Sequence, residues 1–221
     1  MTRFVRFAAF RRVLRKLVLS GAPDLSSLVP RLPKPSAREV TISPEQFAEL
    51  LPAASLPLRM MLLLCHDCAL RASAAIRFCP AQFDATEQVV RLRTKFGRAV
   101  TVPVTPRLAS LLALVTHAPA DSTVPYIKLL TGPRGYSYTT LQNEWQEVRE
   151  RHGIAHVRFH DLRRSMAVNV LKVTADLRLV QALLGHNDLS ATFHYLDHDI
   201  GHATVAQLTS AAYAQDKKET R

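Results

Sequence analysis

The polar residues between His160 and Tyr195 constrain the fold of this chain more than any other feature. His160 and Arg163 stand three residues apart at the start of a predicted helix, so they share one face of it. Gly185 ends the next predicted helix, His186 follows at that exposed end, and Tyr195 comes nine residues later. No fold needs this polar set for its own stability. A chemistry that attacks a phosphodiester with a phenol oxygen does need it, so the fold has to bring these side chains together.

Length and charge narrow the possible classes of protein. The chain has 221 residues, of which 48% are hydrophobic, enough for one full domain with a sizeable core, with or without a short appendage. The formal net charge of +11 favours a polyanionic partner, with nucleic acid first. No apolar run reaches the roughly 20 residues of a membrane span, and the basic start of the chain lacks a signal cleavage site. Three cysteines make no disulfide framework, so we expect a cytoplasmic protein.

The sequence divides into four parts. Residues 1–20 form a predicted basic amphipathic helix, because apolar residues recur at helical spacing among arginines. A proline-rich linker follows at 21–41. The main domain spans 42–200, and a short helix with a charged tail spans 201–221.

The main domain is predicted to be mainly α with a small antiparallel β-sheet. Ser43, Pro44 and Gln46 are typical of a helix start, with a capping box between Ser43 and Gln46. The apolar patterns predict helices at about 46–51, 56–70, 106–117, 138–152, 160–172, 176–184 and 188–196. They predict strands at 88–93 and 99–104, with a turn at Gly97.

The pattern His-x-x-Arg, Gly-His and Tyr resembles the tyrosine recombinases, the phage integrase family. Upstream, Leu70-Arg71 followed by Ser73 is similar to the first arginine motif of that family. Asp84 stands where the family has an acidic residue before a hairpin, and Lys95 lies between the two predicted strands, where the family has its catalytic lysine. The resemblance covers about residues 40–200 and implies the catalytic fold of these DNA breaking-rejoining enzymes.

The resemblance also implies the roles of the site residues. Tyr195 would attack the scissile phosphate and form a 3′-phosphotyrosyl bond. Arg71 and Arg163 would hold the non-bridging oxygens, because a guanidinium matches the geometry of a phosphate. Lys95 would protonate the leaving 5′-oxygen, and His160 would act as general acid and base. The full catalytic set is Arg71, Lys95, His160, Arg163, His186 and Tyr195. The covalent link conserves the bond energy, so no cofactor and no metal is expected.

The expected partner is double-stranded DNA, and strand exchange in this family implies a homotetramer on the DNA. Residues 201–214 would dock on a neighbouring protomer, and no membrane is involved. Basic residues from three parts of the chain are predicted to contact DNA: Arg3, Arg6, Arg11, Arg12, Arg15, Lys16, Arg93, Arg98 and Arg164.

The sequence departs from the family pattern at several positions. Ala74 stands where an acidic residue usually follows the first arginine, and Ala69 replaces a usual glycine. We expect weaker support of Arg71, and hence reduced activity. Residues 1–20 look like the last helix of the amino-terminal clamp domain of the family, so most of that domain is expected to be absent from this chain.

Two alternatives remain open at this stage. One is a type IB topoisomerase-like enzyme that nicks and relaxes DNA as a monomer. The other is a catalytically weak remnant that only binds DNA, favoured by the short front end and by Ala74. A third possibility, a zinc or redox site at Cys65 and Cys68, lacks the second ligand pair that a structural zinc site requires. The sequence indicates neither the recognition site nor the outcome of the reaction.

Overall fold

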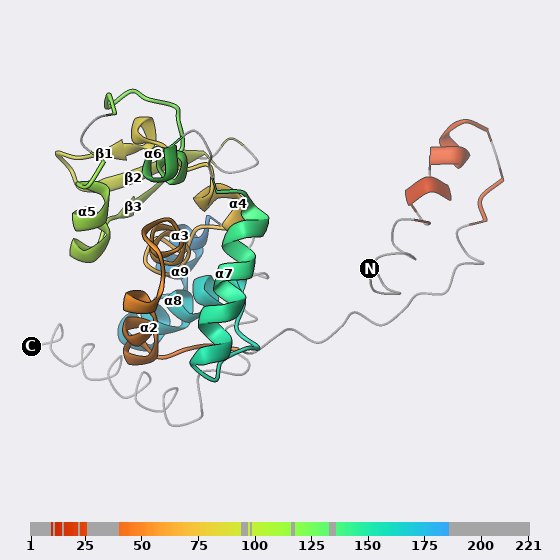
Figure 1. Cartoon of the computed structure of the whole chain (residues 1–221). Helices are drawn as coiled ribbons and strands as arrows, with labels where there is room; N and C mark the ends of the chain where they lie inside the picture. The colour runs from red at the N-terminus through yellow and green to blue at the C-terminus, as the bar shows by residue number, and fades with distance from the viewer. Residues whose placement is uncertain are drawn as a thin grey trace, which may run out of the picture. The chain divides into compact units, whose positions relative to one another are not determined.

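The computed structural model divides the chain into two units, Met1–Arg38 and Glu39–Arg221 (Figure 1). In the first unit, the described residues between 10 and 19 are helical, as the periodicity predicts, and the helix ends at Ser20 and Gly21. The structure describes residues 10, 12–14, 16–21, 23–25, 40–93, 97, 99–115, 118–132 and 136–185.

The second unit is mainly helical and carries one small sheet. Its helices are α2 (Pro44–Leu50), α3 (Leu56–His66), α4 (Ala72–Ala75), α5 (Pro106–Leu112), α6 (Tyr126–Thr131), α7 (Tyr138–Arg151), α8 (Phe159–Thr174) and α9 (Leu177–Leu184), with 3-10 turns at Leu51–Ala53 and Pro80–Gln82. Its strands are β1 (Phe83–Asp84), β2 (Val89–Arg93) and β3 (Ala99–Pro103). The predicted fold class is confirmed.

Side-chain caps define where most of these helices begin. Ser43 accepts from the backbone N–H of Gln46, whose side chain in turn accepts from the backbone N–H of Ser43, so the predicted capping box is present. The side chains of Ser55, Thr105 and Ser137 also accept from a backbone N–H three residues further on. They cap α3, α5 and α7. These local signals explain why the predicted starts of the helices agree well with the structure.

The sheet is antiparallel with the order β1-β2-β3. Arg93 pairs with Ala99, so β2 and β3 form the predicted hairpin. Gly97, between the two strands, has a φ of 79°, a conformation that favours glycine. β1 was not predicted, because a strand of two residues carries no readable alternation.

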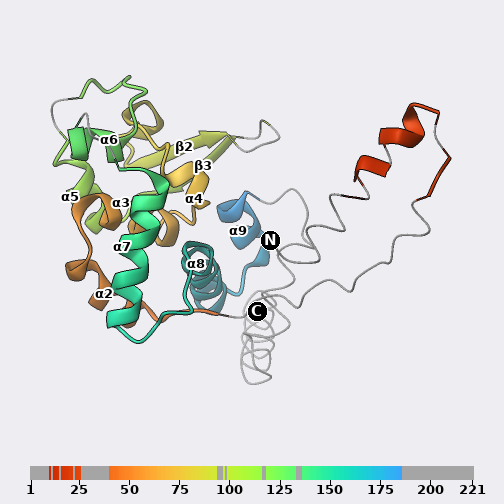
Figure 2. The same cartoon turned by 45° about the vertical axis from the view of Figure 1, so that its right-hand side comes forward.

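Helix α3 forms the centre of the second unit, with α5, α6, α7 and α8 packed around it (Figures 1 and 2). All of its residues except Leu56 and Arg59 are buried. A helix that is apolar on all sides has to be enclosed in this way. A smaller cluster joins α8 to α9, which lie side by side.

The predicted helix at 56–70 is wrong at its carboxyl end, because α3 stops at His66. Asp67 caps that end, and Ala69 has a φ of 50°, a left-handed conformation that ends a helix. Leu70 and Arg71 are extended or irregular before α4 begins. Likewise, α5 ends at Leu112 rather than near 117, and α6 was not predicted.

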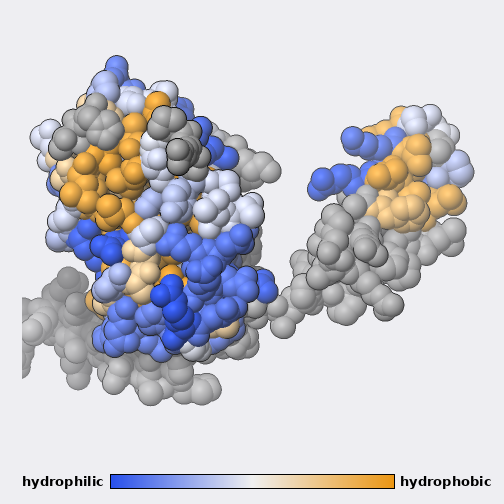
Figure 3. Space-filling model, viewed as in Figure 1, coloured by the Kyte–Doolittle hydropathy of each residue, from blue (hydrophilic) through white to orange (hydrophobic). Residues whose placement is uncertain are grey.

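On the face shown in Figure 3, apolar residues gather over the part of the second unit that carries α5, whereas hydrophilic residues cover the part around α2 and α7. Among the described residues, no helix combines the length and the apolar character needed to cross a membrane. The exposed face of α7 belongs to the hydrophilic part of this surface, and it lies next to the site described below.

Candidate active site

Arg71 lies at the start of α4, where the chain leaves the turn that ends α3. It has extended backbone angles and caps the helix, and its backbone carbonyl accepts from the N–H groups of Ala74 and Ala75. Its side chain is exposed. The turn thus projects the guanidinium out of the core.

Arg163 lies on α8 and is only 4% exposed. One terminal nitrogen donates to the carbonyl oxygen of Ala69, two residues before Arg71. The other donates to the carbonyl oxygen of Leu184 at 2.7 Å, where α9 ends. A single buried guanidinium therefore connects the Arg71 turn to the segment that leads into His186.

A cavity of about 620 Å³ contains both arginines of the predicted catalytic set. The turn before α4, strands β2 and β3, Arg163 of α8 and the end of α9 line it. Arg77 and Arg93 line it as well, so four guanidinium-bearing residues share one cavity with no carboxylate among its described lining residues. Ala74 also lines this cavity, at the position where the family pattern has an acidic residue.

His160 lies in the first turn of α8 and is exposed. Partial burial lowers its pKa below the ordinary value of 6.5, and the positive charge of Arg163 lowers it further. Arg71 and Arg164 act in the same direction, whereas Asp161 opposes them. His160 is thus biased toward the neutral form, which can accept a proton.

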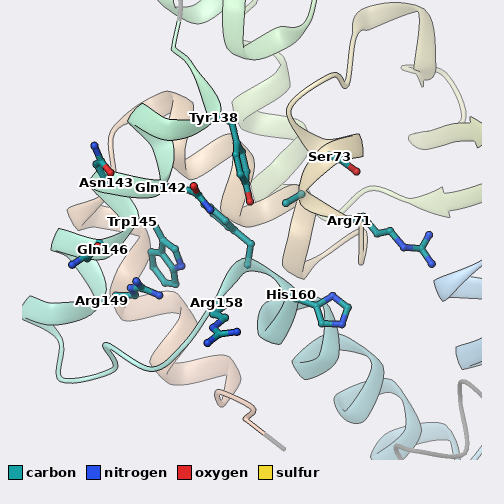
Figure 4. A pocket seen from close by; sticks show the side chains of 12 residues that line it. Arg71, Ser73, Tyr138, Gln142, Asn143, Trp145, Gln146, Arg149, Arg158 and His160 are labelled. Atoms are coloured by element: carbon teal, nitrogen blue, oxygen red, sulfur yellow. The ribbon is translucent and has the colours of Figure 1, made fainter. Parts of the chain in front are cut away.

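Arg71 and His160 line a second cavity, of about 580 Å³ (Figure 4). In this view both side chains extend to the same side, away from Trp145 on α7. Of the described residues in the predicted catalytic set, Arg71 is the one that lines both cavities. The structure therefore brings together the three described members of the predicted set: Arg71, His160 and Arg163.

The other three predicted catalytic residues, Lys95, His186 and Tyr195, lie outside the described residues. In the sequence, Lys95 falls between β2 and β3, and His186 follows Gly185, which ends α9 in a left-handed conformation as predicted. Their roles stay predictions.

Among the residues predicted to contact DNA, Arg93 is exposed at the end of β2, and Arg12 and Lys16 are exposed in the first unit. Arg164 differs, because only 6% of it is exposed. It is therefore buried in α8 to about the same degree as Arg163, and its contact with DNA stays a prediction. The remaining predicted contacts, at Arg3, Arg6, Arg11, Arg15 and Arg98, lie outside the described residues.

An ionic cluster around the buried Asp67, next to the site, was not predicted from the sequence. Asp67, only 3% exposed, accepts from Arg107 Nε at 2.7 Å and from Arg107 Nη2 at 2.5 Å. Thr105 Oγ1 also donates to this carboxylate at 2.5 Å, and His66 Nδ1 lies 2.8 Å from it. Phe47 stacks on the His66 ring with centroids 3.8 Å apart. This cluster fastens the Arg71 turn to the start of α5.

The thiols of Cys65 and Cys68 lie in the same region. Burial raises the pKa of each to about 12. Both are therefore protonated at neutral pH, and a protonated thiol is a poor nucleophile and a poor metal ligand. They act as small apolar residues in the core.

Comparison with known proteins gives a consistent result. The model of the phage integrase family matches residues 41–202. The chain is 32% identical to the tyrosine recombinase XerC of Haemophilus ducreyi over 72% of its own length and 53% of that protein. It is 29% identical to the putative integrase/recombinase y4qK of Sinorhizobium fredii, over 77% of its length and 56% of that protein. The chain thus spans about half the length of these relatives.

A solved structure of the Tn1549 transposon integrase in complex with a circular intermediate DNA has a similar fold, with a TM-score of 0.69 and 10% identity. The match covers 92% of this chain and 77% of that one.

Proposed function

The chain belongs to the phage integrase family, and on that premise we propose that it is a site-specific tyrosine recombinase that cleaves and rejoins duplex DNA. The observation that carries this proposal is the meeting of Arg71, Arg163 and His160 around two adjoining cavities, from segments far apart in the sequence. Guanidinium groups in such a cavity stabilise the charge that builds up on a phosphate under attack. The relatives named as recombinases, and the similar integrase bound to DNA, support the choice of substrate.

The proposed reaction begins when the phenol oxygen of Tyr195 attacks the scissile phosphorus. The P–O5′ bond breaks, and a 3′-phosphotyrosyl bond and a free 5′-hydroxyl result. The neutral imidazole of His160 takes the phenolic proton, because a phenol with a pKa of about 10 is mostly protonated at neutral pH. Lys95 gives a proton to the 5′-oxygen. Attack by a 5′-hydroxyl from another strand then reverses these steps and restores Tyr195.

Arg163 has a second task in this scheme. Because its two terminal nitrogens already bind the carbonyl oxygens of Ala69 and Leu184, it places the segments that lead into Arg71 and His186 on either side of one cavity. His186 would add a further hydrogen-bond donor to the phosphate.

A suicide substrate, a nicked duplex that traps the covalent intermediate, tests the proposal. The wild-type chain should form a covalent DNA adduct that survives denaturing electrophoresis, and Tyr195→Phe should form none. Tyr136→Phe is the matched control, because it removes the same hydroxyl from a residue that packs against the core. The proposal is wrong if Tyr195→Phe still forms the adduct, or if the wild type forms none on any cognate site.

The assembly is also part of the proposal. Exchange of two duplexes needs four active sites, so we infer a homotetramer on the DNA, acting in the cytoplasm. Sedimentation of the Tyr195→Phe chain with cognate DNA should show four protomers on two duplexes. A topoisomerase-like enzyme would instead relax supercoiled plasmid as a monomer.

A further inference from the structure

The cavity lined by Arg71 and His160 extends beyond these two residues. It has a volume of about 580 Å³ and extends along α7 (Figure 4). Aromatic rings form one side of it: Trp145 and Phe159 are stacked with centroids 5.9 Å apart, and Tyr138 lies against Phe159. Gln142 and Arg158 line the same space and are exposed.

Two buried hydrogen-bond donors at this cavity have no acceptor among the described residues. One is the indole Nε1 of Trp145, a residue that is 2% exposed, and the other is Nε of Arg149. Arg149 already donates to the carbonyl of Val157 through its Nη1 at 2.8 Å, so its guanidinium is held in place with one edge unused. A buried donor without a partner costs about 1–3 kcal/mol, so native proteins rarely keep one without a reason.

The charge of the cavity indicates what kind of acceptor would fit. Arg71, Arg149 and Arg158 line it, and no carboxylate does so among the described lining residues. The nearby carboxylate of Glu150 does not line the cavity, and it accepts a hydrogen bond from Gln146 at 2.8 Å. Guanidinium groups in a fixed position favour a planar or tetrahedral oxyanion over a neutral ligand.

We propose that this cavity binds a second phosphodiester of the DNA backbone, next to the one that is cleaved, through Arg149, Arg158 and the indole N–H of Trp145. The inference rests on the proposed function, because Arg71 and His160 place the cavity beside the scissile phosphate. The side chain of Gln142 is exposed and can turn aside as the phosphate enters, and the exposed side chain of Arg158 can turn toward the phosphate. The second contact fixes the strand on both sides of the reacting group and so orients it for attack.

The first test measures how salt weakens binding to a random-sequence DNA duplex, with Tyr195→Phe in every chain to prevent cleavage. Each phosphate contact contributes about 0.9 to the slope of log Kd against log salt concentration. Arg158→Gln should lower the slope by about 1. Arg151→Gln is the matched control, because Arg151 is exposed at the end of α7 but does not line the cavity, so the slope of this variant should equal that of the parent chain. A slope unchanged by Arg158→Gln, or lowered equally by Arg151→Gln, overturns the proposal.

The second test uses the fact that Trp145 is the single tryptophan of the chain. Its indole N–H gives one cross-peak in a nitrogen-15 correlation spectrum, and a new hydrogen bond to a phosphate moves that proton downfield. The duplex should move the cross-peak in the parent chain and in Arg151→Gln, but not in Arg158→Gln. A duplex with uncharged methylphosphonate linkages should leave it in place. A cross-peak that ignores the charged duplex overturns the proposal.

The suicide-substrate assay separates this inference from the function on which it rests. If no covalent adduct forms but the slope and the cross-peak respond as described, the proposed reaction fails and the phosphate site stands. If the adduct forms at the usual rate while both signals stay unchanged, the reaction stands and the phosphate site fails.

Discussion

Arg163 combines a structural role with a proposed role in the reaction. It reaches a carbonyl oxygen 94 residues away in the chain and another 21 residues away. Burying a charge is costly unless hydrogen bonds satisfy it, and here two backbone carbonyls do so. The same bonds hold the Arg71 turn and the end of α9 at a fixed distance. A change at Arg163 should therefore affect both the stability and the proposed reaction.

We predict that Arg163→Lys lowers the free energy of unfolding by about 3 kcal/mol, because one ammonium group cannot span two carbonyl oxygens and leaves a buried charge poorly paired. Urea unfolding measures this loss. The control is Arg91→Lys, since Arg91 pairs with Asp84 at the surface at 2.9 Å and its replacement should cost less than about 0.5 kcal/mol. Equal midpoints for the two variants would contradict the structural role of Arg163.

Asp67 gives a prediction about pH. Burial raises its pKa, but hydrogen bonds from His66, Arg107 and Thr105 and the charge of Arg107 outweigh burial and lower the pKa from 3.8 to about 2. A lowered folded-state pKa contributes stability that is present above about pH 4 and is lost as the pH falls through about 2. The shift corresponds to about 2 kcal/mol.

Asp67→Asn should therefore weaken the protein at neutral pH and flatten the fall in stability between about pH 4 and pH 2. Thermal unfolding across that range measures the effect. Asp84→Asn serves as a comparison, because Asp84 pairs with Arg91 at the surface, where water weakens the ion pair. This substitution should therefore change the stability less than Asp67→Asn does. The same acid profile for Asp67→Asn and the parent chain would rule out the assigned state of Asp67.

At the scale of helices and strands, the starts of the elements were predicted better than their ends. Ser43, Ser55 and Thr105 act through neighbouring backbone groups, so their effect is visible in local sequence. The end of α3 depends instead on Arg107 and Thr105 binding Asp67 and on Arg163 binding the carbonyl of Ala69. Contacts between distant residues leave no local pattern. The apolar run through Leu70 therefore predicted a longer helix than the chain forms.

The end of α8 provides a test of this reasoning. Ala175 caps it with a φ of 55°, in the left-handed region where a Cβ is unfavourable, and the residue is exposed. Ala175→Gly should raise the free energy of unfolding by about 1 kcal/mol, measured by urea denaturation. Ala113 is the matched control, because it caps α5 with a φ of −64° and is also exposed. Ala113→Gly should lower stability by about 0.5–1 kcal/mol, and the same sign for both variants would refute the explanation.

For the molecule as a whole, the sequence predicted which residues meet but not the cavity around them. Arg71 precedes α4, whereas His160 and Arg163 both lie on α8, and the resemblance to the family indicated that they share a site. Trp145 and Arg149 gave no such signal, because an apolar ring and an arginine at helical spacing are typical of any amphipathic helix. Only the packing of α7 against the start of α8 shows that their donors lack partners.

The two units of the chain should contribute to different properties. Both buried clusters of described residues lie within Glu39–Arg221, whereas Phe10 and Val13 in the first unit are 55% and 53% exposed. Stability should therefore depend on the second unit. The six basic residues predicted to bind DNA before residue 20 should contribute mainly to affinity.

Removal of residues 1–38 should change the free energy of unfolding by less than about 0.5 kcal/mol, because no described core residue is lost. The same deletion should lower the slope of log Kd against log salt concentration by up to about 5, since six phosphate contacts at about 0.9 each are removed. Fluorescence anisotropy with a DNA duplex measures the slope, and urea unfolding measures stability.

The control is a full-length variant in which six basic residues become glutamine: Arg3, Arg6, Arg11, Arg12, Arg15 and Lys16. It should reproduce the change in slope. If the deletion lowers stability by several kcal/mol and leaves the slope unaltered, the first unit packs on the second and its charges face away from DNA.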